Sequence, residues 1–191
     1  RKGKCPQVTV EHGENGRAVI KAGRTRFNAP TLPVDDFPLP PTGELDSAAP
    51  LSRFTVPAAR FLADLAALAP CQSTEETRYY LNGIALQVRD LAGRERFTMA
   101  ATDGHNIGAA SRELPAGAET LPDAILRSKA VSLLGKAAKL ASDAETMAIE
   151  FDTAGRSAGL FRLDLGPVSI WTKAIDGTFP DWAKCFDGDQ L

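Results

Sequence analysis

The residues with the clearest chemical potential are Asp103 and His105, in the run Ala101-Thr-Asp-Gly-His-Asn-Ile107. A carboxylate and an imidazole can form a general acid–base pair, but such a pair needs a nucleophile or a metal ion to act on a substrate. The sequence contains no G-x-S-x-G, no H-E-x-x-H and no cluster of carboxylates. Asp-Gly is typical of a tight turn. We therefore predict a turn between two strands and no catalytic residue; the alternative is an enzyme of unrelated class that uses Asp103 and His105.

Three lysines, Lys129, Lys136 and Lys139, follow a helical spacing. Together with Ser132 they lie on one face of a helix, opposite an apolar stripe. Such a face is either simply solvated or lies along a phosphate backbone. Each lysine–phosphate contact contributes a salt slope of about −0.9, so three contacts give weak attraction without sequence preference. The net charge of −2 excludes a polybasic binder whose affinity comes from bulk charge.

Two adjacent tyrosines, Tyr79 and Tyr80, follow Arg78 just before a strand-like run. At the start of a strand, one ring would point inward and the other outward. As an exposed pair, the rings would stack on bases or sugars of a nucleic acid. Glu75 and Glu76 repel phosphate, so any such contact must be local.

Cysteine and histidine are too sparse to form a metal site. Cys5, Cys71 and Cys185 include no C-x-x-C pair, and His12 and His105 are far apart. Hydrophobic residues make up 43% of the chain and charged residues 24%, as in ordinary globular proteins. No apolar stretch reaches the length of a membrane span, and we expect no signal peptide. We expect a soluble cytoplasmic protein without metal or cofactor.

Apolar spacing predicts two helices, over residues 57–69 and from about 129 to 141. Ser128 is expected to cap the second helix. The apolar positions of the first helix are Ala58, Phe61, Leu62, Leu65, Leu68 and Ala69. Those of the second are Ala130, Leu133, Leu134, Ala137 and Leu140.

Strand-like runs surround both helices, separated by glycine-rich turn signals. They cover residues 8–10, 17–21, 24–28, 80–88, 96–102, 106–112, 124–126, 147–151, 157–163 and 168–175. Residues 53–175 therefore form the pattern β-α-β-β-β twice. Residues 33–52 contain five prolines and several acids, which indicates a linker.

A second repeat links the ends of the chain. Val34-Asp-Asp-Phe-Pro38 is similar to Ile175-Asp-Gly-Thr-Phe-Pro180, and each closes a series of strands. The two phenylalanines, Phe37 and Phe179, lie about one domain length apart. We infer that residues 1–38 end an earlier copy of the same domain.

Three motifs in this order and spacing resemble the bacterial sliding clamp, the beta subunit of DNA polymerase III. They are Arg78-Tyr-Tyr-Leu-Asn-Gly83, Ala101-Thr-Asp-Gly-His105 and Asp176-Gly-Thr-Phe-Pro-Asp-Trp182. The run from Gly23 to Pro38 resembles the end of that family's first domain. The resemblance implies an α+β DNA clamp fold, a duplicated β-α-β-β-β unit with two adjacent helices packed on antiparallel sheets. Residues 1–45 would end a preceding clamp domain and its linker, 53–182 would be a complete middle domain, and 183–191 would begin the linker to an absent third domain.

The family's role follows as an implication of the resemblance. Two three-domain protomers form a homodimeric ring around double-stranded DNA, without sequence preference, and the ring is not an enzyme. It tethers the polymerase by topology, so weak DNA contacts are an advantage. On this basis Lys129, Lys136 and Lys139 would face the hole, and Tyr79 and Tyr80 would lie near DNA. Glu75 stands where some members have a neutral side chain, which argues against that local contact.

The family also binds short peptides of the polymerase catalytic subunit, the clamp loader and repair proteins in a cleft between domains two and three. The implied domain-two wall comprises Leu81, Thr102, Gly104, His105, Asn106, Ile107, Pro180, Lys184 and Cys185. Asn106 and Lys184 stand where the family commonly has arginine, and Cys185 where it has an aliphatic residue, so the preferred peptide can differ. The alternative is a stand-alone clamp-like domain that binds such peptides without encircling DNA.

Overall fold

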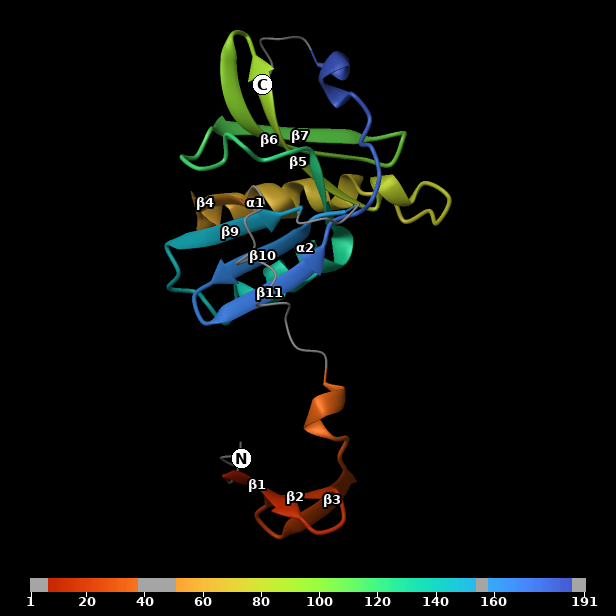
Figure 1. Cartoon of the computed structure of the whole chain (residues 1–191), viewed down its shortest axis with the longest axis vertical. Helices are drawn as coiled ribbons and strands as arrows, with labels where there is room; N and C mark the ends of the chain where they lie inside the picture. The colour runs from red at the N-terminus through yellow and green to blue at the C-terminus, as the bar shows by residue number, and fades with distance from the viewer. Residues whose placement is uncertain (1–6, 38–50, 154–157, 187–191) are drawn as a thin grey trace, which may run out of the picture. The chain divides into compact units, whose positions relative to one another are not determined.

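The computed structural model describes residues 7–37, 51–153 and 158–186 (Figure 1). The chain separates into two compact units, Arg1–Thr42 and Gly43–Leu191. Cys5, most of the expected linker (38–50), Ser157 of an expected strand, and the end of the expected second linker (187–191) lie outside the described residues.

The first unit is a three-stranded antiparallel sheet of β1 (Val8–Gly13), β2 (Arg17–Ala22) and β3 (Thr25–Pro30), followed by a 3₁₀ turn (Val34–Asp36). Ile20 is the register partner of both Val10 and Phe27, so these three side chains share one face. Glu11 and Lys21 form an ion pair on the opposite face. Phe27 is 61% exposed and Val10 67%, so the described residues leave the apolar face uncovered.

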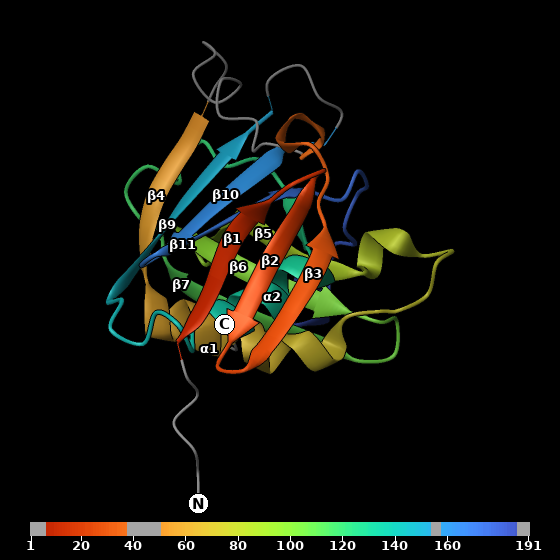
Figure 2. The ribbon, with the colours of Figure 1, turned by 90° about the horizontal axis from the view of Figure 1, so that it is seen from below.

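The second unit contains two four-stranded antiparallel sheets in the described part of the chain, ordered β11-β10-β9-β4 and β7-β6-β5-β8. The strands are β4 (Leu51–Pro57), β5 (Gly83–Leu91), β6 (Arg94–Thr102), β7 (Ile107–Glu113), β8 (Ala124–Arg127), β9 (Thr146–Asp152), β10 (Leu160–Leu165) and β11 (Val168–Lys173). The duplicated β-α-β-β-β pattern is confirmed, with one feature that the sequence did not indicate. The first strand of each repeat pairs with the sheet of the other repeat: β4 with β9, and β8 with β5. Figure 2 shows β4 alongside β9 and β10 in the first of these sheets.

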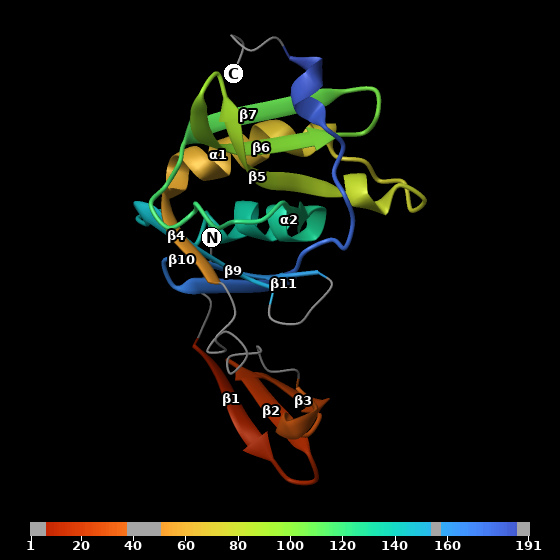
Figure 3. The same ribbon diagram turned by 45° about the horizontal axis from the view of Figure 1, so that its top comes forward.

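Two helices, α1 (Ala58–Leu68) and α2 (Ser128–Ala137), follow these exchanged strands. They contact one another and lie side by side (Figure 3). α1 packs against β6 and β7, whereas α2 packs against β11 and β8. The prediction of two adjacent helices on antiparallel sheets is confirmed.

The details of α2 correct the sequence analysis. The helix ends at Ala137, and residues 138–140 form a turn. Ser128 does not cap it: Arg127 is the N-cap residue, no side chain caps the helix, and the N–H of Ser128 donates to the carbonyl of Asn82 at 3.1 Å. Leu133 and Leu140 are exposed, whereas Val131 is buried. The buried stripe therefore passes through Ala130, Val131, Leu134 and Ala137, so the prediction is confirmed for Ala130, Leu134 and Ala137 and wrong for the two exposed leucines.

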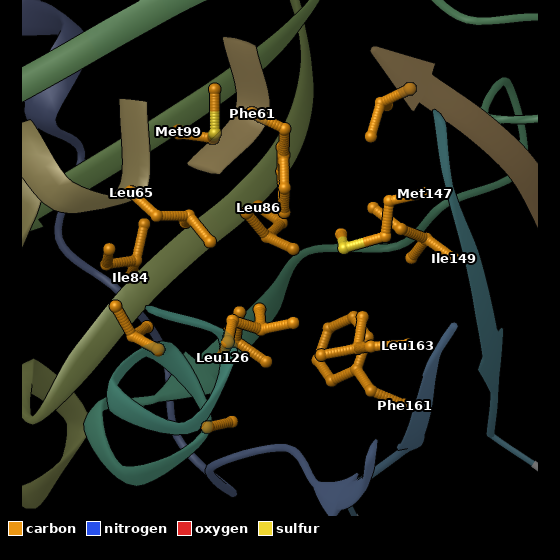
Figure 4. Close-up of a cluster of buried hydrophobic side chains, with 14 of the residues drawn as sticks. Phe61, Leu65, Ile84, Leu86, Met99, Leu126, Met147, Ile149, Phe161 and Leu163 are labelled. Atoms are coloured by element: carbon orange, nitrogen blue, oxygen red, sulfur yellow. The ribbon is translucent and has the colours of Figure 1, made fainter. Parts of the chain in front are cut away.

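The main core lies between the sheets and the helices. Figure 4 shows Phe61 and Leu65 of α1 lying toward Leu86 and toward Met147 and Ile149 of the other sheet. The ring of Phe97 contacts those of Phe54 and Phe61 with centroids 5.5 and 6.3 Å apart. Both repeats thus share one core, to which both helices contribute.

A second apolar cluster covers the opposite face of the β7-β6-β5-β8 sheet. Leu81 of the preceding loop lies there with Ile175, Phe179 and Trp182 of the C-terminal segment. Trp182 is buried, and its Nε1–H donates to Oε1 of Gln87 at 2.8 Å. This hydrogen bond and the buried rings hold residues 174–186 across the outer face of the sheet.

The expected strand over residues 80–88 begins later than predicted. Tyr79–Leu81 forms a 3₁₀ turn, and β5 starts at Gly83. The N–H of Ser73 donates to the carbonyl of Leu81 at 3.0 Å, which closes the loop over residues 73–81. The tyrosines therefore lie at the end of a closed loop.

We predict that Leu134→Ala destabilises the protein by about 2–5 kcal/mol, because Leu134 is fully buried and its removal leaves a cavity. Leu140→Ala is the matched control, because Leu140 is 76% exposed in the turn after α2. This change should alter stability by less than about 0.5 kcal/mol. Urea denaturation of both variants measures the difference. Equal losses of stability in the two variants would show that the buried stripe of α2 has been assigned to the wrong face.

Candidate functional site

The turn between β6 and β7 is organised by Asp103. Its Oδ1 accepts hydrogen bonds from the N–H groups of His105 (2.8 Å) and Asn106 (2.6 Å), and its Oδ2 accepts one from the side-chain amide of Asn106 (3.0 Å). These donors hold the pKa of Asp103 well below its usual range, with Asn106 the largest cause. The Asp103 carboxylate thus stabilises the turn, in which His105 and Asn106 are exposed to solvent.

Arg78 is a residue of this site that the sequence analysis did not single out. Its Nε and Nη2 donate to the two carboxylate oxygens of Glu75 at 2.8 and 2.6 Å. The pairing lowers the pKa of Glu75 and raises that of Arg78. A Cβ on Gly104, which has φ +91°, would clash with Nη1 of Arg78, so the guanidinium lies directly against the turn. Nothing in the sequence signalled this pair, because Glu75 and Arg78 lie in a loop, where a three-residue spacing does not imply contact.

This ion pair changes the electrostatic interpretation of the tyrosine loop. The charge of Glu75 was expected to repel phosphate, but Arg78 compensates it at hydrogen-bond distance. Glu76, also exposed, is a second acid in this loop.

The two tyrosines occupy different environments. Tyr79 is 52% exposed, whereas Tyr80 is half-buried against the second apolar cluster. Their rings meet edge to face with centroids 6.0 Å apart. Tyr80 therefore supports the orientation of Tyr79, and only Tyr79 offers most of its ring to solvent.

Tyr79 lies close to the start of the lysine-bearing helix. It lines a surface hollow of about 350 Å³ together with Asn82, Arg127, Lys129 and Asp176. Arg127 was not predicted; its Nε donates to the carbonyl of Lys173 at 2.9 Å.

All three predicted lysines are exposed. Lys129 and Lys136 lie on α2, and Lys139 lies in the turn that follows. The structure thus brings Tyr79 and Lys129 to one hollow and continues a basic face along α2, interrupted by the exposed Leu133.

The predicted cleft residues come from three segments at the second apolar cluster. Leu81 and Thr102 are buried and Ile107 is half-buried, with Leu81 and Ile107 both packed in the cluster. The exposed members are Gly104, His105, Asn106, Pro180, Lys184 and Cys185. Leu81 lies beneath this surface, so among these residues Ile107 is the apolar side chain that remains partly accessible beside the exposed polar groups.

The last of these segments is a short 3₁₀ turn over Trp182–Cys185. Lys184 pairs with Asp181 at 2.9 Å, which raises the pKa of the lysine. Cys185 is a free and exposed thiol. The partner of Lys184 in this ion pair therefore comes from the same segment.

Within the described residues, no group of three or more His, Cys, Asp or Glu side chains is arranged to hold a metal ion. None of the helices in the described ranges is long and apolar enough to cross a membrane.

Comparison with known families decides the identity of this fold. The family model for the central domain of the DNA polymerase III beta subunit matches residues 55–181. The chain belongs to the beta sliding clamp family. The beta sliding clamp of Caulobacter vibrioides is 34% identical over 179 residues, which are 93% of this chain and 45% of the relative. The Escherichia coli K12 clamp is 30% identical over 173 residues, 90% of this chain and 42% of the relative.

Solved clamp structures give the same result. The structure of Caulobacter crescentus pol III beta is 33% identical, with a TM-score of 0.74 over 93% of this chain and 45% of that chain. A Bartonella birtlesii sliding clamp bound to griselimycin is 32% identical, with a TM-score of 0.74 over 90% of this chain and 43% of that chain. The chain spans about half the length of the clamps that it matches.

We predict that Asp103→Ala lowers Tm at pH 7, and that the deficit shrinks as the pH falls below about 4, the ordinary pKa of Asp. The folded-state pKa lies below that value, so the stabilisation is complete above it and is lost as the pH falls toward the folded pKa. Thermal unfolding followed by circular dichroism between pH 7 and pH 3 measures the effect.

Glu76→Ala, which removes an exposed acid from the neighbouring loop, is the control. A deficit for Asp103→Ala that is independent of pH would contradict the assignment of the carboxylate as the anchor of the turn.

Proposed function

We propose that the chain is the end of the first domain and the whole middle domain of a bacterial sliding clamp, a non-catalytic processivity factor for DNA polymerase. In the longer, homodimeric protein it helps to encircle duplex DNA in the cytoplasm. Family membership and the coverage of 42–45% of the relatives support this assignment.

The uncovered face of the first unit supports the proposed domain division. A three-stranded sheet with Val10, Ile20 and Phe27 on one side has an apolar face that a second layer would bury. We infer that the rest of a preceding clamp domain covers this face. Residues 1–45 are then the last strands of that domain and its linker, 53–182 are the middle domain, and 183–191 lead to a third domain.

We propose that the exposed, lysine-bearing face of α2 beside Tyr79 faces DNA. Lys129, Lys136 and Lys139 supply mobile positive charges, and Tyr79 supplies one stacking surface. Because these contacts address phosphates and ring faces, they carry no sequence preference. A protein that encloses DNA needs such weak contacts, since tight contacts would oppose sliding.

The second apolar cluster is the surface for which we propose peptide binding. Leu81 and Ile107 provide an apolar base, and His105, Asn106 and Lys184 provide polar groups at its rim. We propose that this is the middle-domain wall of a cleft for short peptides of the polymerase catalytic subunit, the clamp loader and repair proteins. The other wall would come from the third domain.

We predict that replacing Lys129, Lys136 and Lys139 with alanine in the full-length protein shortens its retention on closed circular DNA. The salt slope of retention should fall in magnitude by up to about 0.9 for each lysine that contacts a phosphate. Retention after loading, measured by gel filtration at several salt concentrations, tests this expectation.

A charge-matched variant with Arg24, Arg94 and Lys173 replaced by alanine, all exposed and outside α2, is the control. Equal salt slopes for the two triple variants would show that Lys129, Lys136 and Lys139 are merely solvated.

A further inference from the structure

The second apolar cluster is partly open to solvent. Its core members are buried, but five apolar side chains that pack against them are only half-buried: Tyr80, Ile107, Ala109, Ala183 and Phe186. We call these five side chains the open surface of the cluster. Such a surface can receive the apolar side chains of a short peptide, whereas the charges around it decide which other side chains the peptide can carry.

Five charged side chains border the open surface, and we call them the rim. They are Glu75 and Arg78 of the loop before β5, Asp103 of the turn between β6 and β7, and Asp181 and Lys184 of the segment that contains Trp182. The loop and the turn touch, because the Arg78 guanidinium lies against the turn. The charge of Asp103 acts on both Glu75 and Arg78, so these three groups share one electrostatic field.

Each cation of the rim already has a carboxylate partner. Nε and Nη2 of Arg78 donate to the two carboxylate oxygens of Glu75 at 2.8 and 2.6 Å. Nζ of Lys184 lies 2.9 Å from Oδ2 of Asp181. Because both pairs are exposed, they add little to stability. They nevertheless cancel most of the attraction that an incoming anion would feel, since the opposite charges lie at hydrogen-bond distance.

The third carboxylate of the rim is held by neutral donors instead. Asp103 accepts hydrogen bonds from the N–H groups of His105 and Asn106 and from the side-chain amide of Asn106. These donors satisfy the oxygens without removing the charge of the carboxylate. Within the described residues, the rim therefore has an excess of negative charge, and the exposed Glu76 of the same loop adds to it.

Other charges near the cluster do not offset this excess. Further along the same face of the sheet, Arg89 pairs with Asp123 at 2.6 Å, and Arg96 is the register partner of Glu113. Asp176 lines the hollow beside Tyr79, which it shares with two cations. These groups balance one another, so the sign of the field at the open surface is set by the rim.

We propose that the open surface selects peptides that carry lysine or arginine beside their apolar side chains, and disfavours peptides that carry aspartate or glutamate there. Glu75 and Asp181 determine this charge preference, because each cancels a cation that would otherwise attract an anionic peptide. The inference rests on the proposed function and specifies the chemistry of the peptide partner.

The test uses the full-length protein and three fluorescein-labelled peptides. All have leucine and phenylalanine at the centre, and their flanking positions are lysine, glutamine or glutamate. Binding is measured by fluorescence polarisation at low salt and at about pH 8, where an imidazole is uncharged. We expect the lysine peptide to bind at least about fivefold more tightly than the glutamate peptide, with the glutamine peptide between them. The difference should shrink at about 1 M salt, where the Debye length is about 3 Å.

The double variant Glu75→Gln and Asp181→Asn frees both cations of the rim and keeps the shape of each side chain. It should abolish the preference for the lysine peptide or reverse it, and each single change should act in the same direction by a smaller factor. Asp143→Asn with Glu145→Gln makes the same change of charge at exposed positions before β9 and is the matched control. The control should keep the preference of the unmodified protein.

The failure of this inference is distinguishable from that of the proposed function. Tighter binding of the glutamate peptide, equal binding of all three peptides, or a preference that survives in the double variant would overturn the charge preference and leave the proposed cleft intact. Binding of none of the peptides would contradict the cleft and the charge preference together.

Discussion

The exchange of strands between the two repeats is the constraint on which the rest of this structure depends. β4 completes the sheet of the second repeat through β9, and β8 completes the sheet of the first through β5. Each exchanged strand leads directly into a helix, so the pairing brings α1 and α2 together and gives them one core. A helix that buries one face must expose the other. The exposed face of α2 is the lysine-bearing one, which is how an interaction between strands determines where the positive charge lies.

The two faces of the β7-β6-β5-β8 sheet divide the proposed roles. One face packs against the helices, while the other carries the second apolar cluster and the segment held by the Trp182–Gln87 hydrogen bond. The loop over residues 73–82 and the turn at Asp103 meet at the edge of that cluster, where Arg78 lies between them. The groups proposed to face DNA and those proposed to bind peptides are thereby connected through the contact of Arg78 with the turn.

Periodicity and turn chemistry predicted the elements well, because they depend on local sequence. The spacing of Phe61, Leu65 and Leu68 defines α1, and Asp103-Gly104 defines the turn. The strand exchange could not be predicted in this way, since it depends on pairing between distant segments. Asp64 interrupts an apolar stripe, yet its buried pair with Arg112 joins residues 48 positions apart. The two wrong positions in the predicted stripe of α2 have a simple cause: Leu133 and Leu140 fit the same spacing as the buried residues, and only tertiary packing distinguishes them.

The central claim is that the full-length protein holds DNA by enclosure, and one measurement tests it directly. The loaded protein is followed on closed circular DNA, and the circle is then cut once at a site far from any bound polymerase. Enclosure predicts slow dissociation from the intact circle and rapid loss once free ends exist, at a salt concentration that suppresses ionic contacts. Dissociation at the same rate before and after the cut would contradict the account, because a protein that grips DNA is indifferent to its ends.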